Sequence, residues 1–150
     1  MRDNMTRIMG LDIGDSRIGV ALSDPLRMLA SPLTIIHRAG GPGDFEAIMA
    51  LVRQHQVGRV IAGLPFSLDG SLGRQAEKVK AFVAELGRYL EIPVEFRDER
   101  LTTVTAKRLV HEARKVERGT RYDAMAAALI LQGYLDEDHQ VTEPEPPPDG

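Results

Sequence analysis

The sequence predicts a single α/β domain in which a β-hairpin leads a mixed sheet and helices cover the faces of that sheet. Its 150 residues, 43% hydrophobic and 27% charged, suit one soluble domain with one core. Two apolar stretches near the N-terminus flank a short turn, which indicates a hairpin. Beyond them, short apolar runs alternate with segments of helical period, which implies parallel strands joined by right-handed crossovers.

The first three expected elements are strands. Residues 8–13 are almost wholly apolar, as in a strand buried on both faces. Residues 14–16 (Gly-Asp-Ser) form a turn, and residues 18–22 alternate apolar with small or polar side chains, so they form the second strand of a hairpin. Residues 33–36 are a shorter third strand, and the glycines and proline of residues 40–43 mark a loop.

The next elements alternate between helix and strand. Residues 45–52 have helical spacing, and Gly58 lies where the chain would leave that helix. Residues 60–62 are a buried strand, and apolar residues from Leu72 to Leu90 recur in steps of three and four, as in an amphipathic helix. Val94 and Phe96 belong to a fifth strand.

Two helices are expected after the fifth strand. Thr102 or Thr103 could cap a helix that runs to about Ala113, and residues 114–121 form a basic loop. The last helix is expected to bury one face, made by Tyr122, Met125, Ala126, Leu129 and Gly133.

The C-terminal segment differs in composition from the rest of the chain. Residues 136–150 carry six acidic residues, no Lys or Arg and a run of prolines, so residues 1–135 are expected to form the domain and 136–150 a disordered tail. The net charge is −3, but without the tail 19 basic residues face 16 acidic ones. The mildly positive charge of residues 1–135 is compatible with a nucleic-acid partner but does not by itself indicate one.

Several function classes are excluded or disfavoured by composition. The absence of cysteine excludes disulfides and thiolate metal sites. No apolar run is long enough to cross a bilayer, and the polar residues 1–6 do not resemble a secretory signal. We therefore expect a cytoplasmic protein without a membrane partner, either monomeric or homodimeric.

Asp12 is a carboxylate inside an otherwise apolar strand. Burying an unpaired charge costs several kcal/mol or shifts its pKa, so Asp12 should have a partner or a metal ion. Alternatively, Asp12 lies at the end of the strand and caps the turn at Gly14. The spacing alone favours neither explanation.

Glu99 and Asp123 are two further candidates. Glu99 follows the fifth strand, where sites of α/β sheets gather, although a solvated loop is the commoner explanation there. Asp123 opens the last helix, and capping alone would explain it. Together with Asp12 these carboxylates form a possible oxygen-ligand site for Mg²⁺ or Mn²⁺. Two such ions roughly 4 Å apart could support phosphodiester hydrolysis.

Four motifs, in order, resemble the YqgF family of bacterial Holliday-junction-resolvase-like proteins, also described as pre-ribosomal RNA nucleases. They span almost all of residues 9–135. The matching motifs are Gly10-Leu-Asp-Ile-Gly14 with Arg17-Ile-Gly-Val-Ala21, Gly63-Leu-Pro65 with Asp69-Gly70, Asp98-Glu-Arg-Leu-Thr-Thr103, and Asp123 with Ala126-Ala127 and Ile130-Leu-Gln132.

The resemblance implies a ribonuclease H-like fold, with a five-stranded mixed sheet and helices on both faces. It also implies a metal-dependent nuclease whose catalytic and metal-binding residues are Asp12, Glu99 and Asp123. Its expected role is the processing of pre-16S rRNA. Arg97 stands where the family often has an aromatic residue, which is a modest departure that leaves the carboxylates untouched.

An enzyme that cuts structured nucleic acid is the leading hypothesis. Six basic residues would contact phosphates, namely Arg17, Arg100, Arg114, Lys115, Arg118 and Arg121. A solvated loop is the simpler explanation for most of these charges. The alternatives are a Holliday-junction resolvase, a non-catalytic RNA-binding ribosome-assembly factor, and a nucleotide hydrolase. The last would need a second actin-like lobe that 150 residues do not supply.

Overall fold

The computed structural model describes residues 6–65, 73–98 and 120–142, with the backbone alone for residues 120–123 and 138–142. Its centre is a five-stranded sheet in the order β3-β2-β1-β4-β5. The strands are β1 (Arg7–Ile13), β2 (Arg17–Ser23), β3 (Ala30–His37), β4 (Val57–Leu64) and β5 (Val94–Asp98). The pairs β1–β2 and β2–β3 are antiparallel, whereas β1–β4 and β4–β5 are parallel. The predicted hairpin-led mixed sheet is confirmed.

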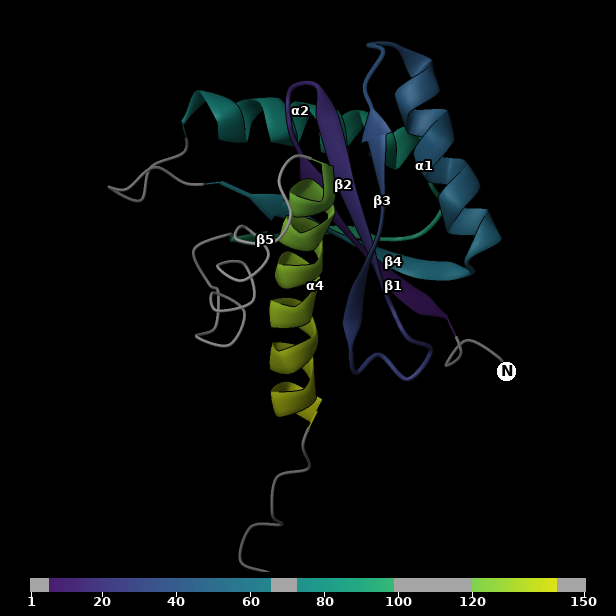
Figure 1. Cartoon of the computed structure of the whole chain (residues 1–150), viewed down its shortest axis with the longest axis vertical. Coiled ribbons are helices and arrows are strands. Elements are labelled where there is room, and N and C mark those ends of the chain that lie inside the picture. Colours follow the sequence, from purple (N-terminus) through teal and green to yellow (C-terminus); the bar gives the residue numbers. More distant parts are fainter. Residues whose placement is uncertain (1–5, 66–72, 99–119, 143–150) are drawn as a thin grey trace, which may run out of the picture.

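Helices cover both faces of the sheet (Figure 1). Helices α1 (Pro42–Gln54) and α2 (Arg74–Tyr89) pack on one face, where Ile48 and Leu86 join Leu11 in the larger core cluster. Helix α4 (Thr120–Thr142) packs on the other face, where Leu131 and Leu135 join a second cluster. The sheet is therefore buried on both sides, as the apolar run of residues 8–13 predicts.

Strand β1 divides its side chains between these two cores. Met9 and Leu11 point to α1 and α2, and Ile8 belongs to the cluster under α4. Gly10 lies on the α4 face, because a Cβ added to it would lie 2.8 Å from Leu131 Cβ and 2.9 Å from the carbonyl oxygen of Ala127. Helix α4 thus touches the backbone of β1, which only a glycine permits.

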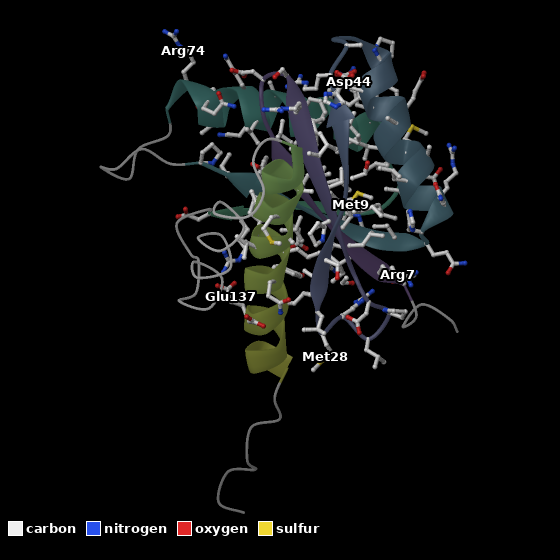
Figure 2. The ribbon with its side chains drawn as sticks, in the orientation of Figure 1. Arg7, Met9, Met28, Asp44, Arg74 and Glu137 are labelled. Atoms are coloured by element: carbon white, nitrogen blue, oxygen red, sulfur yellow. The ribbon has the colours of Figure 1, made fainter. Side chains whose placement is uncertain are left out.

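The direction of α4 follows from contacts at its C-terminal half. The amide of Ile8 donates to Ser23 Oγ, Ser23 pairs with Ala30, and the amide of Ala30 donates to Gln132 Oε1. These contacts place the C-terminal half of α4 at the N-terminal end of β1. Figure 2 shows Met28 at this same end, where its carbonyl accepts a hydrogen bond from Gln132 Nε2. Helix α4 and strand β1 therefore run in opposite directions.

Two expectations near α1 need correction. The predicted loop at residues 40–43 is shorter, because α1 begins at Pro42. The prediction that Gly58 ends this helix is wrong. Gly58 lies inside β4, and the left-handed residue after the helix is Gln56, with φ of 56°. Gly58 instead lies close to Thr6, since an added Cβ would be 2.5 Å from Thr6 Oγ1.

The expectations for the last helix are only partly met. Leu129 and Gly133 are buried as expected, but Met125 and Ala126 are only half-buried. The buried side chains of α4 that share the core cluster with the sheet are Ala127, Ala128, Ile130, Leu131 and Leu135. Residues 124–131 of the helix are all apolar, so the periodicity of this stretch does not single out one face. It also continues to Thr142, seven residues past the expected end of the domain.

The helix expected at residues 102–113 and most of the basic loop lie outside the described residues. In the described part of the chain, no helix is both long and apolar enough to cross a bilayer.

Candidate active site

Asp12 is half-buried near the carboxyl end of β1, where it pairs with Gly19 of β2. Side chains on a strand alternate between faces, so Asp12 shares the α4 face with Gly10. It lies two residues beyond Gly10, about 6.6 Å farther along the strand. Asp12 is therefore on the sheet face that carries α4, close to the strand end that faces the start of that helix.

Asp123 lies in the first turn of α4. It precedes Ala127, whose carbonyl oxygen faces Gly10, by four residues or about 6 Å of helix rise. Because α4 and β1 run in opposite directions, this step and the step from Gly10 to Asp12 lead to the same end of the sheet (Figure 1). The fold therefore places the backbones of Asp12 and Asp123 at one end, while the side chain of Asp123 lies outside the description.

Glu99 itself lies outside the described residues, but the strand before it is described. Strand β5 ends at Asp98, which pairs with Leu64 at the end of β4. Strands β1, β4 and β5 are parallel, so their carboxyl ends meet at one edge. Glu99 follows directly in the sequence, and its convergence with Asp12 and Asp123 stays a prediction. No three acidic or histidine side chains gather elsewhere among those described.

The predicted phosphate contacts are described only at Arg17. Arg17 begins β2, two residues before the partner of Asp12, and its carbonyl accepts the amide of Gly14 at 2.8 Å. It thus lies at the same end of the sheet as Asp12. Arg121 lies in the first turn of α4, with its side chain outside the description. The other four, Arg100, Arg114, Lys115 and Arg118, lie outside the described residues.

Arg97 is buried at a contact between β5 and α4 that the sequence does not indicate. Its side chain is only 6% exposed, and its Nη2 donates to Glu137 Oε2 of α4 at 2.7 Å. The interpretation of Arg97 as a modest departure missed this contact between β5 and α4. One signal was available, namely that Arg97 stands where the family often has an aromatic residue. The two partners are 40 residues apart, so local sequence does not show the pairing.

A second polar group lies beside it on the same face of the sheet. Arg59 of β4 donates through Nη1 both to Glu95 Oε2 of β5 and to the hydroxyl oxygen of Tyr134 on α4. Its ion pair is more open than that of Arg97, because the Arg59 and Glu95 side chains are 37% and 41% exposed. The two groups show that α4 crosses β4 and β5 partly through polar contacts.

Two solved structures show the fold class. The RuvC of T. thermophilus, solved in complex with a Holliday junction substrate, aligns with a TM-score of 0.58 at 14% identity, covering 89% of this chain and 96% of that one. The fowlpox virus resolvase aligns with a TM-score of 0.52 at 13% identity, covering 88% of this chain and 98% of that one. The fold is thus the ribonuclease H-like fold of the Holliday junction resolvases, as the sequence resemblance implies.

The family follows from sequence comparison. The family model described as "RuvX: Holliday junction resolvase" matches residues 6–137, and the chain belongs to this family. A "Putative pre-16S rRNA nuclease" of Dehalococcoides mccartyi is 52% identical over 125 residues, covering 83% of this chain and 94% of that protein. A relative of the same name from Roseiflexus sp. is 47% identical over 132 residues, covering 87% and 94%. The expected family and its nuclease class are confirmed.

Proposed function

We propose that this protein is a metal-dependent endonuclease that hydrolyses phosphodiester bonds in structured nucleic acid, and that it processes pre-16S rRNA in the cytoplasm. The names of its relatives support the substrate. One observation carries the proposal. Asp12 lies on the α4 face of β1, one step beyond the contact between Gly10 and Ala127, at the end of the sheet where α4 begins and β5 ends.

In this proposal Asp12, Glu99 and Asp123 hold Mg²⁺ or Mn²⁺. The chemistry of the donors fits, since all three are carboxylates and hard divalent cations prefer oxygen ligands. The position of Asp12 fits as well, because a half-buried carboxylate at a strand end can reach both a neighbouring helix and solvent. When bound, such ions activate water and stabilise the leaving oxygen.

The reaction adds water across one phosphodiester bond. The oxygen of water forms a new bond to phosphorus, the bond from phosphorus to the leaving sugar oxygen breaks, and that oxygen gains a proton. Arg17, at the same end of the sheet as Asp12, would hold a phosphate of the substrate backbone. Arg100, Arg121 and the basic residues before α4 would extend this contact along the substrate.

Asp12→Asn tests the catalytic role, because it keeps the shape of the side chain and removes its charge. If three carboxylates converge, their repulsion strains the metal-free protein, so the variant should lose Mn²⁺-dependent cleavage while its metal-free melting temperature stays equal or rises. The matched control is Asp15→Asn in the following turn. Its side chain is 66% exposed and pairs only at 3.5 Å with Lys78, and it should cleave normally.

A purely structural Asp12 predicts the opposite result. As a turn cap, it would stabilise the protein through hydrogen bonds, and Asp12→Asn would then melt at a lower temperature but cleave at the wild-type rate. That outcome would refute the catalytic assignment.

Cleavage of a DNA junction is the second candidate function, favoured by the description of the family as Holliday junction resolvases. Purified protein should be incubated with precursor ribosomal RNA and with a four-way DNA junction, each with and without Mn²⁺. Metal-dependent cleavage of the RNA alone supports the proposed substrate. Cleavage of the junction alone favours the resolvase, and specific binding without cleavage indicates a non-catalytic assembly factor.

A further inference from the structure

An ion pair joins β5, at the edge of the sheet, to α4, and its arginine is buried while its glutamate is half-exposed. The Arg97 side chain of β5 is 6% exposed, and the Glu137 side chain of α4 is 51% exposed. Figure 2 shows Glu137 on the side of α4 nearest β5. The same guanidinium donates through Nη1 to the carbonyl oxygen of Asp98 at 3.4 Å, so it also contacts the end of its own strand.

The guanidinium of Arg97 packs against α4 at Gly133, where the lack of a side chain leaves room for it. A Cβ added to Gly133 would lie 2.9 Å from Arg97 Cζ, 2.9 Å from Nη2 and 3.1 Å from Nη1. Gly133 precedes Glu137 by one helical turn, so the two residues share a side of α4. Arg97 therefore lies flat against the helix at one residue and forms its ion pair at the next turn.

Such an arrangement is not explained by stability alone. Removing an arginine from water costs free energy that its ion pair often fails to recover, and apolar replacements of similar volume are frequently as stable. A directional ion pair, unlike an apolar contact, fixes the relative position of the two elements that it joins. The ion pair joins β5 to α4. Glu99 is the residue after β5 in the sequence, and Asp123 is in the first turn of α4.

We propose that Arg97 and Glu137, in contact with Gly133, form a positioning clamp that fixes the end of β5 against α4, the two elements that precede Glu99 in the sequence and carry Asp123. The catalytic part of this inference rests on the proposed function, whereas the clamp itself is a property of the fold. Neither residue touches the reacting atoms in this proposal, so both are positioning residues.

The first measurement follows the geometry directly. The chain has no cysteine, so spin labels can be placed on single cysteines introduced at Phe96 of β5, which is exposed, and at Ala126 of α4, which is half-buried. Pulsed electron paramagnetic resonance then measures the distance between the two elements. We expect Glu137→Gln and Arg97→Met to broaden or shift this distribution.

Glu95→Gln is the matched control. It removes the ion pair between Glu95 of β5 and Arg59 of β4, while the hydrogen bond from Arg59 to the Tyr134 hydroxyl of α4 can remain. We expect this variant to keep the wild-type distance distribution, because its ion pair does not span the same two elements. A distribution that broadens equally in Glu95→Gln and Glu137→Gln would overturn the assignment of the clamp to Arg97 and Glu137.

The second measurement is cleavage at a temperature at which every variant is folded. Misplacing a catalytic group by about 1 Å can cost about 100-fold in rate. Glu137→Gln and Arg97→Met should therefore lower kcat by about 10- to 100-fold and raise the Mn²⁺ concentration needed for half the maximal rate, with little change in KM. We expect Arg97→Met to lower kcat even if its melting temperature equals that of the wild type. Replacing a residue that only stabilises the fold would not lower kcat at an unchanged melting temperature.

Three results would overturn the inference or separate it from the proposed function. An unchanged distance distribution in Glu137→Gln overturns the clamp. A broadened distribution with wild-type kcat and Mn²⁺ dependence overturns its positioning role. If the wild-type protein cleaves nothing, the proposed function fails, and the distance measurement decides the clamp by itself.

Discussion

Replacing Gly10 with alanine tests how closely α4 is seated on β1. The new Cβ would lie 2.8 Å from Leu131 Cβ and 2.9 Å from the carbonyl oxygen of Ala127. Ordinary carbon contacts are about 3.5–4.0 Å, so the helix would have to move away by about 1 Å. Neither contacting atom lies at the end of a flexible side chain, so this strain cannot be relieved by a rotamer change.

The size of the effect follows from this overlap. Overpacking of a core costs about 1–3 kcal/mol. In a domain of this length, 1 kcal/mol corresponds to about 2–4 °C of melting temperature, so Gly10→Ala should melt about 2–12 °C lower. Because α4 carries Asp123 and β1 carries Asp12, cleavage at 25 °C should also fall, by up to about 100-fold for a shift of 1 Å.

Gly87→Ala is the matched control. Gly87 lies inside α2, where an added Cβ meets nothing within 4 Å. Alanine in a helix is more stable than glycine by about 0.5–1 kcal/mol, so this variant should melt slightly higher and cleave normally. Thermal melts followed by circular dichroism and cleavage assays on the same preparations check both variants. A Gly10→Ala variant with wild-type melting temperature and activity would refute the close seating of α4.

Two further predictions concern stability. Backbone amide hydrogen bonds, chiefly from Leu29, lower the pKa of Asp24 in the folded protein. The ionised carboxylate therefore stabilises the fold at pH values above the pKa of the unfolded chain. This stabilisation is lost as the pH falls through the pKa of the folded protein. Asp24→Ala should thus lower the melting temperature at pH 7 and lower it less near about pH 3, and an equal loss at both pH values would contradict this linkage. Removing residues 143–150 should not change the melting temperature, whereas truncation after Asp136 should lower it by several degrees, because Arg97 then loses Glu137. Identical melts of both shortened chains would show that the ion pair does not stabilise the fold.

The local elements of this protein are determined by its sequence. An apolar run, followed by apolar residues that alternate with small or polar ones, predicts the hairpin of β1 and β2. Apolar residues spaced three and four apart predict α2 almost to its ends at Arg74 and Tyr89. These patterns suffice because the spacing of apolar residues within a short segment shows both its secondary structure and the face that it buries. Membership in the family was also visible, because its four motifs occur in order along the chain.

Long-range packing, in contrast, is decided only by the tertiary structure. Residues 124–131 of α4 are all apolar, so their spacing does not show which face is buried. The close approach of Ala127 and Leu131 to Gly10 decides it. In the same way only the tertiary structure places Asp12 on the sheet face that carries α4, while its role as a metal ligand stays a prediction. From the sequence, Arg97 was only a modest departure from the family pattern, yet it is buried because Gly133 leaves room for it and Glu137 pairs with it across 40 residues of sequence. A contact between residues so far apart leaves no periodic signal in the chain, because only packing brings them together.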